Sequence, residues 1–439
     1  MTRLAEVILW GTRIGAVSSP DEGGPATFEY DRSFLASGIR VAPLVMPLRE
    51  ASYRFPALSP ETFHGLPGLL ADSLPDKYGS ALIDAWLASQ GRAPDSFTAV
   101  ERLCYVGHRA MGALEYLPAG GPDPATGHEL DIASLVALAS DALGDRETLI
   151  ASFAEPRRGQ AMRDILQVGT SAGGARAKAL IAFNPATQVI RSGQLDLAPG
   201  FEHWLIKLDG VSNNTDKEIL GDPLGFGTVE YAYSLMAHDL GIEMTSCRLL
   251  EEGPRRHFMT RRFDRDESGG RRHMQSLGAL AHLDYNQPNV HSYEEAFAAM
   301  RRLELRHAEL EQLYRRMVFN IVGRNCDDHV KNISFLMDRS GAWALAPAYD
   351  LTYAYRESSR WTAQHQMSMN GKRRGFELGD FIAAGETAQL PRGRAKAILE
   401  QTTEVISNWA KYGEQAGVPD DLAAGVAAEL ELSATRPAS

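Results

Sequence analysis

Two aspartates and one asparagine lie within a short stretch of the chain and have the side chains of a phosphoryl-transfer site. Asp327 is followed five positions later by Asn332, and Asp350 closes the stretch. In phosphoryl-transfer enzymes one Asp orients the attacking hydroxyl, while an Asn and a second Asp hold Mg²⁺ against the phosphates. The Asp-to-Asn spacing is that of the protein-kinase loop H-R-D-x-x-x-x-N, although Arg324-Asn325-Cys326 stands where His-Arg would.

The cluster Asp327-Asp328-His329 has two other interpretations. It could bind a metal ion directly, although helix-spaced ligands such as H-E-x-x-H are absent. It could also be a polar network that caps the preceding helix and has no catalytic role. Taken alone, the capping interpretation is the stronger one, so the rest of the chain has to decide between them.

The elements that would position these side chains are a helix and a hairpin. Apolar residues at helical spacing predict a helix over 305–322. A short apolar run over 333–337, a turn at Asp338-Arg339-Ser340-Gly341 and a second run over 343–346 predict a β-hairpin that ends before Asp350.

A loop of small residues could hold phosphate further upstream. Segment 167–182 has the sequence QVGTSAGGARAKALIA, and such a loop lets backbone N–H groups close on an anion. A P-loop is excluded, because Ala175-Arg176 replaces Lys-Ser/Thr and a strand is expected to follow instead of a helix. A hairpin turn without a ligand is the alternative. We expect one strand to enter and another to leave this loop, which contains Ser171, Ala172, Gly173 and Gly174.

A lysine and a glutamate follow this loop. Residues 203–208 predict a strand with Trp204 and Ile206 on one face and Lys207 on the other. Lys207 either extends to water from an edge strand or meets an anion such as the ATP phosphates. Glu230 falls near the start of a helix predicted over 228–240. Its carboxylate either interacts favourably with the dipole at the helix N-terminus or orients Lys207.

A third strand, predicted over 257–263, would cross to a second lobe. In a two-lobed kinase the adenine binds at such a hinge, which here would contain Arg261 and Phe263. The order of the parts is that of a kinase: small-residue loop, strand lysine, helix glutamate, crossing strand, Asp-to-Asn loop, hairpin and final Asp. Each part is a weak signal, but their occurrence in this order favours a kinase.

The size and composition of the chain limit the other possibilities. A length of 439 residues predicts more than one domain, and a net charge of -11 argues against a free-standing nucleic-acid binder. The three cysteines (Cys104, Cys247 and Cys326) form no C-x-x-C pair, which favours a reducing compartment. We expect no signal peptide and no membrane span, and therefore a cytoplasmic protein.

The predicted fold class is α+β, with three regions. Residues 1–125 form a β-rich N-terminal domain, with one helix over about 69–88. Residues 126–304 form a region like a kinase N-lobe. Residues 305–439 form a mainly helical C-lobe that carries the catalytic loop and the metal-binding Asp.

Several motifs make the chain resemble the HipA-type serine/threonine kinases, which are toxins of bacterial toxin–antitoxin modules. The family pattern N-x-D-x-H-x-K-N matches residues 325–332, Leu-x-P-x-Y-D matches 345–350 and R-F-D-R matches 262–265. The segments Leu66-Pro67-Gly68 and 72–76 are similar to the family's first domain. Two departures are Asp328, where a small residue is usual, and Arg261, where an acidic residue is usual.

The resemblance implies an ATP- and Mg²⁺-dependent serine/threonine protein kinase. Asp327 would be the catalytic base, Asn332 and Asp350 the magnesium ligands, and Lys207 the ATP lysine. His329 and Lys331 of the same pattern would contact the nucleotide. Ser171 stands where family members can carry an inhibitory autophosphorylation, which would add negative charge where the ATP phosphates must lie.

The resemblance also implies partners. These are a small DNA-binding antitoxin, with DNA contacted only through it, and a protein substrate such as an aminoacyl-tRNA synthetase or another translation factor. Two alternatives stay open. The chain could be a catalytically weak module that acts as a corepressor with the antitoxin, or it could phosphorylate a small molecule.

Overall fold

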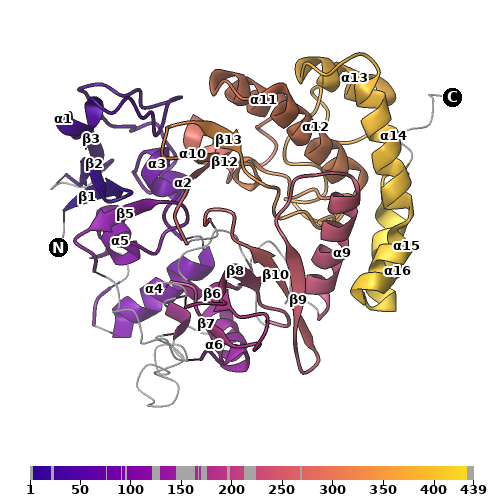
Figure 1. The fold of residues 1–439 in the computed structure, drawn as a ribbon, viewed down its shortest axis with the longest axis horizontal. Coiled ribbons are helices and arrows are strands. Elements are labelled where there is room, and N and C mark those ends of the chain that lie inside the picture. Colours follow the sequence, from indigo (N-terminus) through magenta and orange to yellow (C-terminus); the bar gives the residue numbers. More distant parts are fainter. Residues whose placement is uncertain are drawn as a thin grey trace. The chain divides into compact units, whose positions relative to one another are not determined.

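The fold is described from a computed structural model (Figure 1). The described residues are 3–20, 24–75, 77–89, 91–93, 96–120, 129–144, 164–166, 168–169, 176–194, 198–211, 224–266 and 269–432. They divide into two compact units. Unit 1 contains residues 1–224, 250–275 and 337–342, and unit 2 contains residues 225–249, 276–336 and 343–439.

Unit 1 begins with a five-stranded antiparallel sheet of order β4-β3-β2-β1-β5. Val17 in the central strand β2, Val7 in β1 and Phe28 in β3 are fully buried. This sheet confirms the expected β-rich N-terminal region. Its strands are β1 (Leu4–Leu9), β2 (Thr12–Ser18), β3 (Thr27–Tyr30), β4 (Ser52–Tyr53) and β5 (Leu114–Leu117).

The prediction of a single helix over 69–88 is wrong, because the structure has two helices in this region. The first ends at Ala71 and the second begins at Lys77. Pro75 lies between them, and proline disfavours helical backbone at the residue before it. The described helices of unit 1 are α1 (Arg32–Leu35), α2 (Pro60–Phe63), α3 (Gly68–Ala71), α4 (Lys77–Ser89), α5 (Ala99–Val106) and α6 (Ile132–Gly144).

A second antiparallel sheet of unit 1 has the order β7-β6-β8-β10-β9. Side chains of α4 and α6 pack with Ile181, Trp204 and Ile206 in one buried apolar cluster, so these helices cover one face of the sheet (Figure 1). The strands are β6 (Lys178–Phe183), β7 (Ile190–Ser192), β8 (Glu202–Lys207), β9 (Cys247–Glu252) and β10 (Arg255–Arg261).

Unit 2 is mainly helical, as expected for the C-terminal region. Tyr233 of α9 packs edge-on against Phe319 of α12 and Trp409 of α15, each with ring centroids 5.7 Å apart. The described helices are α9 (Phe226–Asp239), α10 (Leu277–Ala281), α11 (Tyr293–Arg302), α12 (His307–Val322), α13 (Leu378–Thr387), α14 (Arg394–Ser407), α15 (Trp409–Ala416) and α16 (Asp420–Glu429).

The predicted hairpin is present. Strands β12 (Ser334–Met337) and β13 (Trp343–Leu345) belong with β11 (His273–Ser276) to a three-stranded sheet of order β11-β12-β13. Asp338 closes the hairpin turn, because its carboxylate accepts the backbone N–H groups of Ser340 at 2.8 Å and Ala342 at 3.1 Å.

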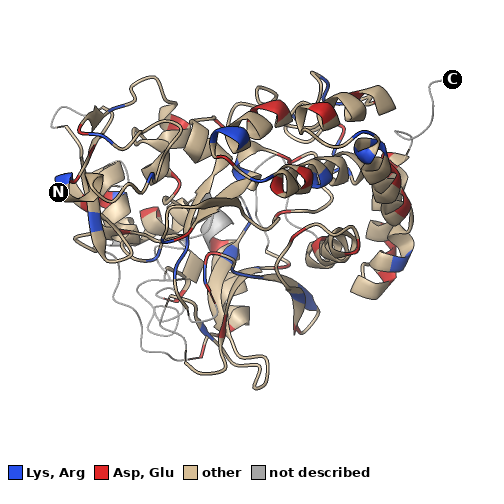
Figure 2. Cartoon of the chain, turned by 45° about the horizontal axis from the view of Figure 1, so that its top comes forward, with Lys and Arg blue, Asp and Glu red and all other residues tan. Residues whose placement is uncertain are grey.

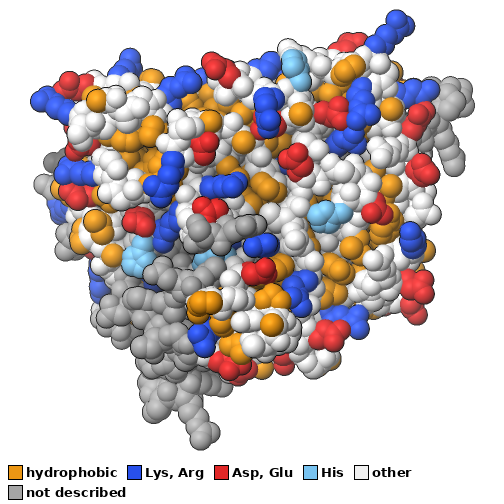
Figure 3. Space-filling view, viewed as in Figure 1, with side chains coloured by type: hydrophobic (Ala, Val, Ile, Leu, Met, Phe, Trp, Pro, Cys, Tyr) orange, Lys and Arg blue, Asp and Glu red, His pale blue; other side chains and the backbone are white. Residues whose placement is uncertain are grey.

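Charges of both signs are interspersed on the described elements (Figure 2). On α14, for example, Arg394 contacts Glu311 at 2.7 Å and Lys396 contacts Glu400 at 3.5 Å. The face in Figure 3 likewise mixes acidic, basic and apolar side chains. Among the described residues, no helix is both long and apolar enough to cross a bilayer.

Candidate active site

The predicted catalytic loop begins where α12 ends. Leu313 and Met317 are fully buried and fix the helix in the core. Its last carbonyl groups accept backbone N–H groups, from Gly323 to Phe319 at 2.9 Å and from Asn325 to Asn320 at 2.8 Å. The helix is therefore capped by its own backbone, and Asp327 follows the end of the helix instead of capping it.

The backbone of Asp327 is held by the loop that follows. Its carbonyl accepts the backbone N–H of His329 at 3.0 Å and the side-chain Nδ2 of Asn332 at 2.9 Å. The Asp327 side chain is 32% exposed, and its Oδ1 lies 3.9 Å from Nε2 of His329. A short 3₁₀ turn, Val330–Asn332, produces this arrangement. The result is a carboxylate that can be reached from solvent on a fixed backbone.

Asp350 is fixed by a different set of contacts at the end of the hairpin. Its φ of +53° lies in the left-handed region, which costs a non-glycine residue roughly 1–2 kcal/mol although Asp tolerates it better than most. Its carbonyl accepts Nδ2 of Asn325 at 3.1 Å. The neighbouring Tyr349 donates its hydroxyl to the carbonyl of Lys331 at 2.6 Å. The hairpin end is thus tied to both ends of the catalytic loop.

Residues from the loop and the hairpin line one small cavity of about 20 Å³, among them Asn325, Asp328, His329, Asn332, Tyr349 and Asp350. The two predicted metal ligands, Asn332 and Asp350, are therefore brought together. Because Nδ2 of Asn332 is engaged by the carbonyl of Asp327, its Oδ1 is the atom that could bind a cation. A carboxylate and an amide oxygen are the hard donors that Mg²⁺ prefers, so these residues fit the metal.

Asp328 departs from the family pattern without leaving an uncompensated charge in the site. Its carboxylate is buried, with Oδ2 3.0 Å from Nδ1 of His365, and its Oδ1 accepts the backbone N–H of Gln366 at 2.8 Å. Asp328 is thereby held on the side of residues 365–366. No group of three His, Cys, Asp or Glu side chains that could hold a metal occurs in the described part of the chain, which argues against the direct metal-cluster interpretation of Asp327-Asp328-His329.

Arg316 is a buried arginine of this site that was not identified from the sequence. Arg316 lines the same cavity from α12 and is 5% exposed. Burial lowers its pKa to about 10, with Glu243 and Tyr349 opposing the shift, so it stays charged at neutral pH. Its position three residues after Leu313 puts it on the buried stripe of α12. A charged residue on an apolar stripe is the signal that could have identified it.

The predicted nucleotide lysine lies in unit 1. Lys207 is half-buried in β8, while Trp204 and Ile206 are buried, as the alternation predicted. Directly opposite Lys207 in the register of the sheet is Lys178 of β6, which is 3% exposed. Two facing lysines repel each other, and a buried one requires an anionic partner. Lys178 was missed, although a lysine that opens an apolar strand after a small-residue loop is a usable signal.

The structure describes only the residues on either side of the small-residue loop. Ser171, Ala172, Gly173 and Gly174 lie outside the described residues, so their predicted role is not tested. The expected strand before the loop is wrong, because residues 164–166 and 168–169 are helical. The expected strand after the loop is present as β6.

The predicted hinge residues lie at the end of β10. Arg261 contacts Glu202 at 3.8 Å, and Phe263 is half-buried. The adjacent Asp264 is fully buried and accepts two hydrogen bonds from Arg262, at 2.9 and 2.7 Å. Burial alone would raise the pKa of Asp264, but Arg262 and Arg265 hold it well below its usual range.

The R-F-D-R element therefore has a structural role. Asp264 also accepts the backbone N–H of Gly112 at 2.7 Å, and Arg265 donates to the carbonyl of Gly112 at 3.0 Å. Gly112 has a φ of +77°, and a Cβ there would meet the backbone N of Met274 at 2.9 Å. The motif thus joins the start of β5 to the end of β10.

Glu230 is 1% exposed and belongs to unit 2, whereas Lys207 belongs to unit 1. Their pairing stays a prediction. The helix begins at Phe226, two residues earlier than expected, and its first turn contains no acidic residue. The interpretation of Glu230 as a first-turn carboxylate is therefore wrong.

Two remaining predicted residues, His329 and Lys331, both lie near the ring of Tyr285. The Nζ of Lys331 lies 4.7 Å from the ring centroid of Tyr285, and the ring of His329 lies 5.9 Å from the same ring. His329 lines the cavity together with Asn332 and Asp350. The geometry thus brings His329 beside the predicted metal ligands, while contacts of Lys331 with a nucleotide stay a prediction.

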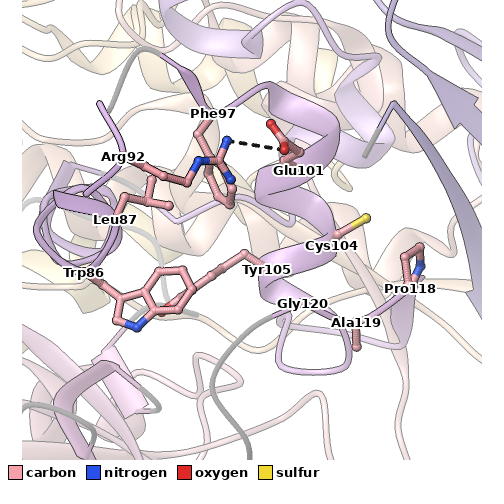
Figure 4. A pocket seen from close by; sticks show the side chains of 10 residues that line it. All are labelled: Trp86, Leu87, Arg92, Phe97, Glu101, Cys104, Tyr105, Pro118, Ala119 and Gly120. Carbon is pink, nitrogen blue, oxygen red and sulfur yellow. Dashed lines mark hydrogen bonds and ion pairs between the residues drawn. The ribbon is translucent and has the colours of Figure 1, made fainter. Parts of the chain in front are cut away.

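A larger cavity in unit 1 is separate from these residues. It has a volume of about 200 Å³ and lies between the end of α4, helix α5 and residues 118–120. Figure 4 shows Trp86 and Tyr105 on one side of it and the ion pair between Arg92 and Glu101, which measures 3.4 Å, on another. Its lining includes none of the residues predicted for phosphoryl transfer.

Two models of known protein families match the chain, one in its N-terminal region and one in its C-terminal region. A family model described as the HipA-like C-terminal domain matches residues 170–409, and one described as the HipA N-terminal domain matches residues 5–117. The chain belongs to the HipA family. The resemblance inferred from the motifs is thereby confirmed.

One curated relative matches part of this HipA-family chain. It is 29% identical over 233 residues to "Putative kinase Y4mE" of Sinorhizobium fredii, a match that spans 46% of this chain and 54% of that relative. The chain thus matches about half the length of this curated relative.

The fold is similar to that of a solved HipA structure. The chain matches HipA of Shewanella oneidensis MR-1, solved in complex with HipB and operator DNA, with a TM-score of 0.63 over 97% of this chain and 94% of that one. At 17% identity this likeness concerns the fold alone. It confirms the predicted fold class.

Proposed function

We propose that this chain is an ATP- and Mg²⁺-dependent serine/threonine protein kinase that acts as the toxin of a toxin–antitoxin module. The observation that carries the proposal is that Asn332 and Asp350 line one cavity together with His329, whose Nε2 lies 3.9 Å from the partly exposed carboxylate of Asp327. Its membership of the HipA family supports the same activity.

Each residue has a defined task in this proposal. Asp327 accepts a hydrogen bond from the acceptor hydroxyl and takes its proton as the phosphoryl group is transferred. Asn332 and Asp350 would hold Mg²⁺, which when bound neutralises charge on the phosphates. The backbone contacts of Asp327 and Asp350 keep the two carboxylates in place, so that catalysis consists of positioning and charge stabilisation.

The nucleotide would be held by residues of unit 1. Lys207 and the facing Lys178 present two positive charges on neighbouring strands, which suits the phosphates of ATP. Ser171, Ala172, Gly173 and Gly174 would close over these phosphates through their backbone. Arg261 and Phe263 would meet the adenine, and Glu230 would orient Lys207.

We extend the proposal to regulation and partners by analogy with the HipA family. A phosphate on Ser171 would place negative charge where the ATP phosphates bind and so inhibit the enzyme. A DNA-binding antitoxin similar to the HipB of the Shewanella complex would be the partner. The substrate would be a protein of the translation apparatus, such as an aminoacyl-tRNA synthetase.

The proposal is tested by phosphate transfer from γ-labelled ATP in a cytoplasmic extract of a bacterial host. Wild-type protein is expected to label one or a few protein bands on serine or threonine, and Asp327→Ala is expected to label none. Asp338→Asn, an exposed aspartate in the hairpin turn, is the control that should retain labelling. Equal labelling by wild type and Asp327→Ala would refute the kinase assignment.

A growth experiment tests the toxin role separately. Expression of wild-type protein without an antitoxin is expected to slow a bacterial host, and Asp350→Asn is expected to restore growth. Toxicity that persists in Asp350→Asn, at the same protein level, would indicate an activity other than phosphoryl transfer.

A further inference from the structure

The predicted catalytic loop is anchored by buried polar groups of two other segments of the chain. Oδ2 of Asp328 lies 3.0 Å from Nδ1 of His365 and accepts the hydroxyl of Tyr293 at 2.8 Å. Oδ1 accepts the backbone N–H of Gln366 at 2.8 Å. The residue directly after Asp327 is therefore held by α11 and by the segment at 365–366.

These hydrogen bonds continue through α12 to the metal-binding aspartate. Asn320 donates its Nδ2 to the hydroxyl of Tyr293 at 3.1 Å. Asn325 donates its Nδ2 to Oδ1 of Asn320 at 2.9 Å and to the carbonyl of Asp350 at 3.1 Å. One continuous chain of hydrogen bonds thus runs from His365, through Asp328, to the backbone of Asp350.

The chain is buried along its whole length. Tyr293 is 1% exposed, His365 2%, Asn325 2%, Asp328 3% and Asn320 8%. In such a dry environment hydrogen bonds are strong and unpaired groups are costly, so a buried polar network specifies one arrangement of its members. The residue before Asp327 is fixed as well, because the backbone N–H of Cys326 donates to the carbonyl of Ala354 at 2.9 Å.

We propose that Tyr293, Asp328 and His365 are positioning residues that set the carboxylate of Asp327 relative to Asp350. This inference rests on the proposed function, because the positioning role concerns phosphoryl transfer from ATP to an acceptor hydroxyl at a site that contains both carboxylates. None of the three needs to touch the substrate. They act through Asp327 and Asp350, where a misplacement of about 1 Å can reduce a rate by roughly 100-fold.

Tyr293→Phe is the sharpest test, because it removes one hydroxyl and leaves the ring, the volume and the charge unchanged. Its matched control is Tyr314→Phe. Tyr314 is a fully buried tyrosine of α12 whose hydroxyl also makes a hydrogen bond, at 2.8 Å to the carbonyl of Phe381. Asp328→Asn, which keeps the shape but removes the charge, is the second variant.

Two readouts are needed. We expect Tyr293→Phe and Asp328→Asn to lower kcat for phosphate transfer roughly tenfold or more, while KM for ATP stays within about twofold because the lysines are unchanged. We also expect faster amide hydrogen exchange in the peptide covering residues 325–332. Tyr314→Phe should leave kcat, KM and exchange unchanged after correction for any change in melting temperature.

The outcomes separate this inference from the proposed function. If wild-type protein transfers phosphate and Tyr293→Phe matches Tyr314→Phe in kcat and in loop exchange, the positioning role is refuted and the kinase assignment stands. If wild-type protein transfers no phosphate to any acceptor, the kinase assignment is refuted. Loop exchange then still decides whether Tyr293 and Asp328 anchor residues 325–332, and unchanged exchange refutes the anchoring.

Discussion

The carboxylate of Asp328 and the imidazole of His365 form a buried ion pair of 3.0 Å immediately after the predicted catalytic base. Burial alone would lower the pKa of His365, but Asp328 outweighs it and raises the pKa to about 10. His365 is therefore protonated at neutral pH, and the pair carries no net charge. This pairing explains how a second aspartate can stand beside Asp327 without disturbing a metal site.

The raised pKa predicts a stability that depends on pH. Because the pKa of His365 is higher in the folded protein than its ordinary value of 6.5, its contribution to the free energy of unfolding is complete below pH 6.5 and is lost as the pH rises through about 10. His365→Gln leaves a buried carboxylate unpaired, which costs about 3 kcal/mol. We expect thermal unfolding to show a large difference from wild type at pH 6 and a small one at pH 10. The same difference at both pH values would contradict the ion pair.

The facing lysines predict two separate losses of nucleotide affinity. Removing one charge-assisted hydrogen bond to phosphate costs about 1.5–3 kcal/mol, or roughly 10–100-fold in affinity. Lys207→Met and Lys178→Met are each expected to weaken binding of a fluorescent ATP analogue by this factor. Lys396→Met, an exposed lysine of α14, is the control. Unchanged affinity in Lys178→Met would exclude Lys178 from the phosphate site.

The proposed role of Asp350 as a metal ligand predicts that its replacement raises the Mg²⁺ concentration needed for activity. Asp350→Asn replaces one anionic oxygen donor with a neutral one, so the Mg²⁺ concentration for half-maximal activity should rise at least about tenfold. The measurement is phosphate transfer over a Mg²⁺ titration at saturating ATP. Asp338→Asn in the turn of the same hairpin should follow the wild-type curve. If Asp350→Asn needs the same Mg²⁺ concentration as wild type for half-maximal activity, the metal is bound by other residues.

Asp264 predicts a large effect on stability. Its buried carboxylate neutralises Arg262 and Arg265 and accepts the N–H of Gly112. Asp264→Asn leaves buried guanidinium charge unneutralised and is expected to cost about 3–5 kcal/mol. Asp266→Asn, two residues later, keeps the Oδ1 that accepts the backbone N–H of Gly270 at 2.7 Å, so it should change stability by no more than about 1 kcal/mol. Equal urea midpoints for the two variants would contradict the structural role of R-F-D-R.

Much of the site could be predicted from the sequence because its parts are local. Asp327, Asn332 and Asp350 follow one helix end and one hairpin, so their spacing could indicate a common site. Asn332 and Asp350 do line one cavity, while the catalytic and metal-binding roles of the three residues stay predictions. The exposure of Lys207 likewise follows from strand alternation. Local hydrogen bonds and side-chain periods govern these features.

Other parts could not be predicted because they depend on contacts between distant segments. Tyr293 and His365 are 35 and 37 positions away from Asp328, and neither belongs to a motif. That Lys178 lies opposite Lys207 depends on the register between β6 and β8, which the sequence alone does not determine. The strand expected before the small-residue loop proved helical, because a short apolar run fits either period and tertiary packing decides between them.

The central claim of the proposed function is that one ATP molecule is bound by Lys207 at its phosphates and by Asp350 through its metal ion. A crystal structure with a non-hydrolysable ATP analogue and Mg²⁺ tests it most directly. The account predicts a phosphate oxygen within hydrogen-bond distance of Nζ of Lys207 and a metal ion bound by Asn332 and Asp350, with Asp327 facing the terminal phosphate. A nucleotide bound away from either Lys207 or Asp350 would contradict it.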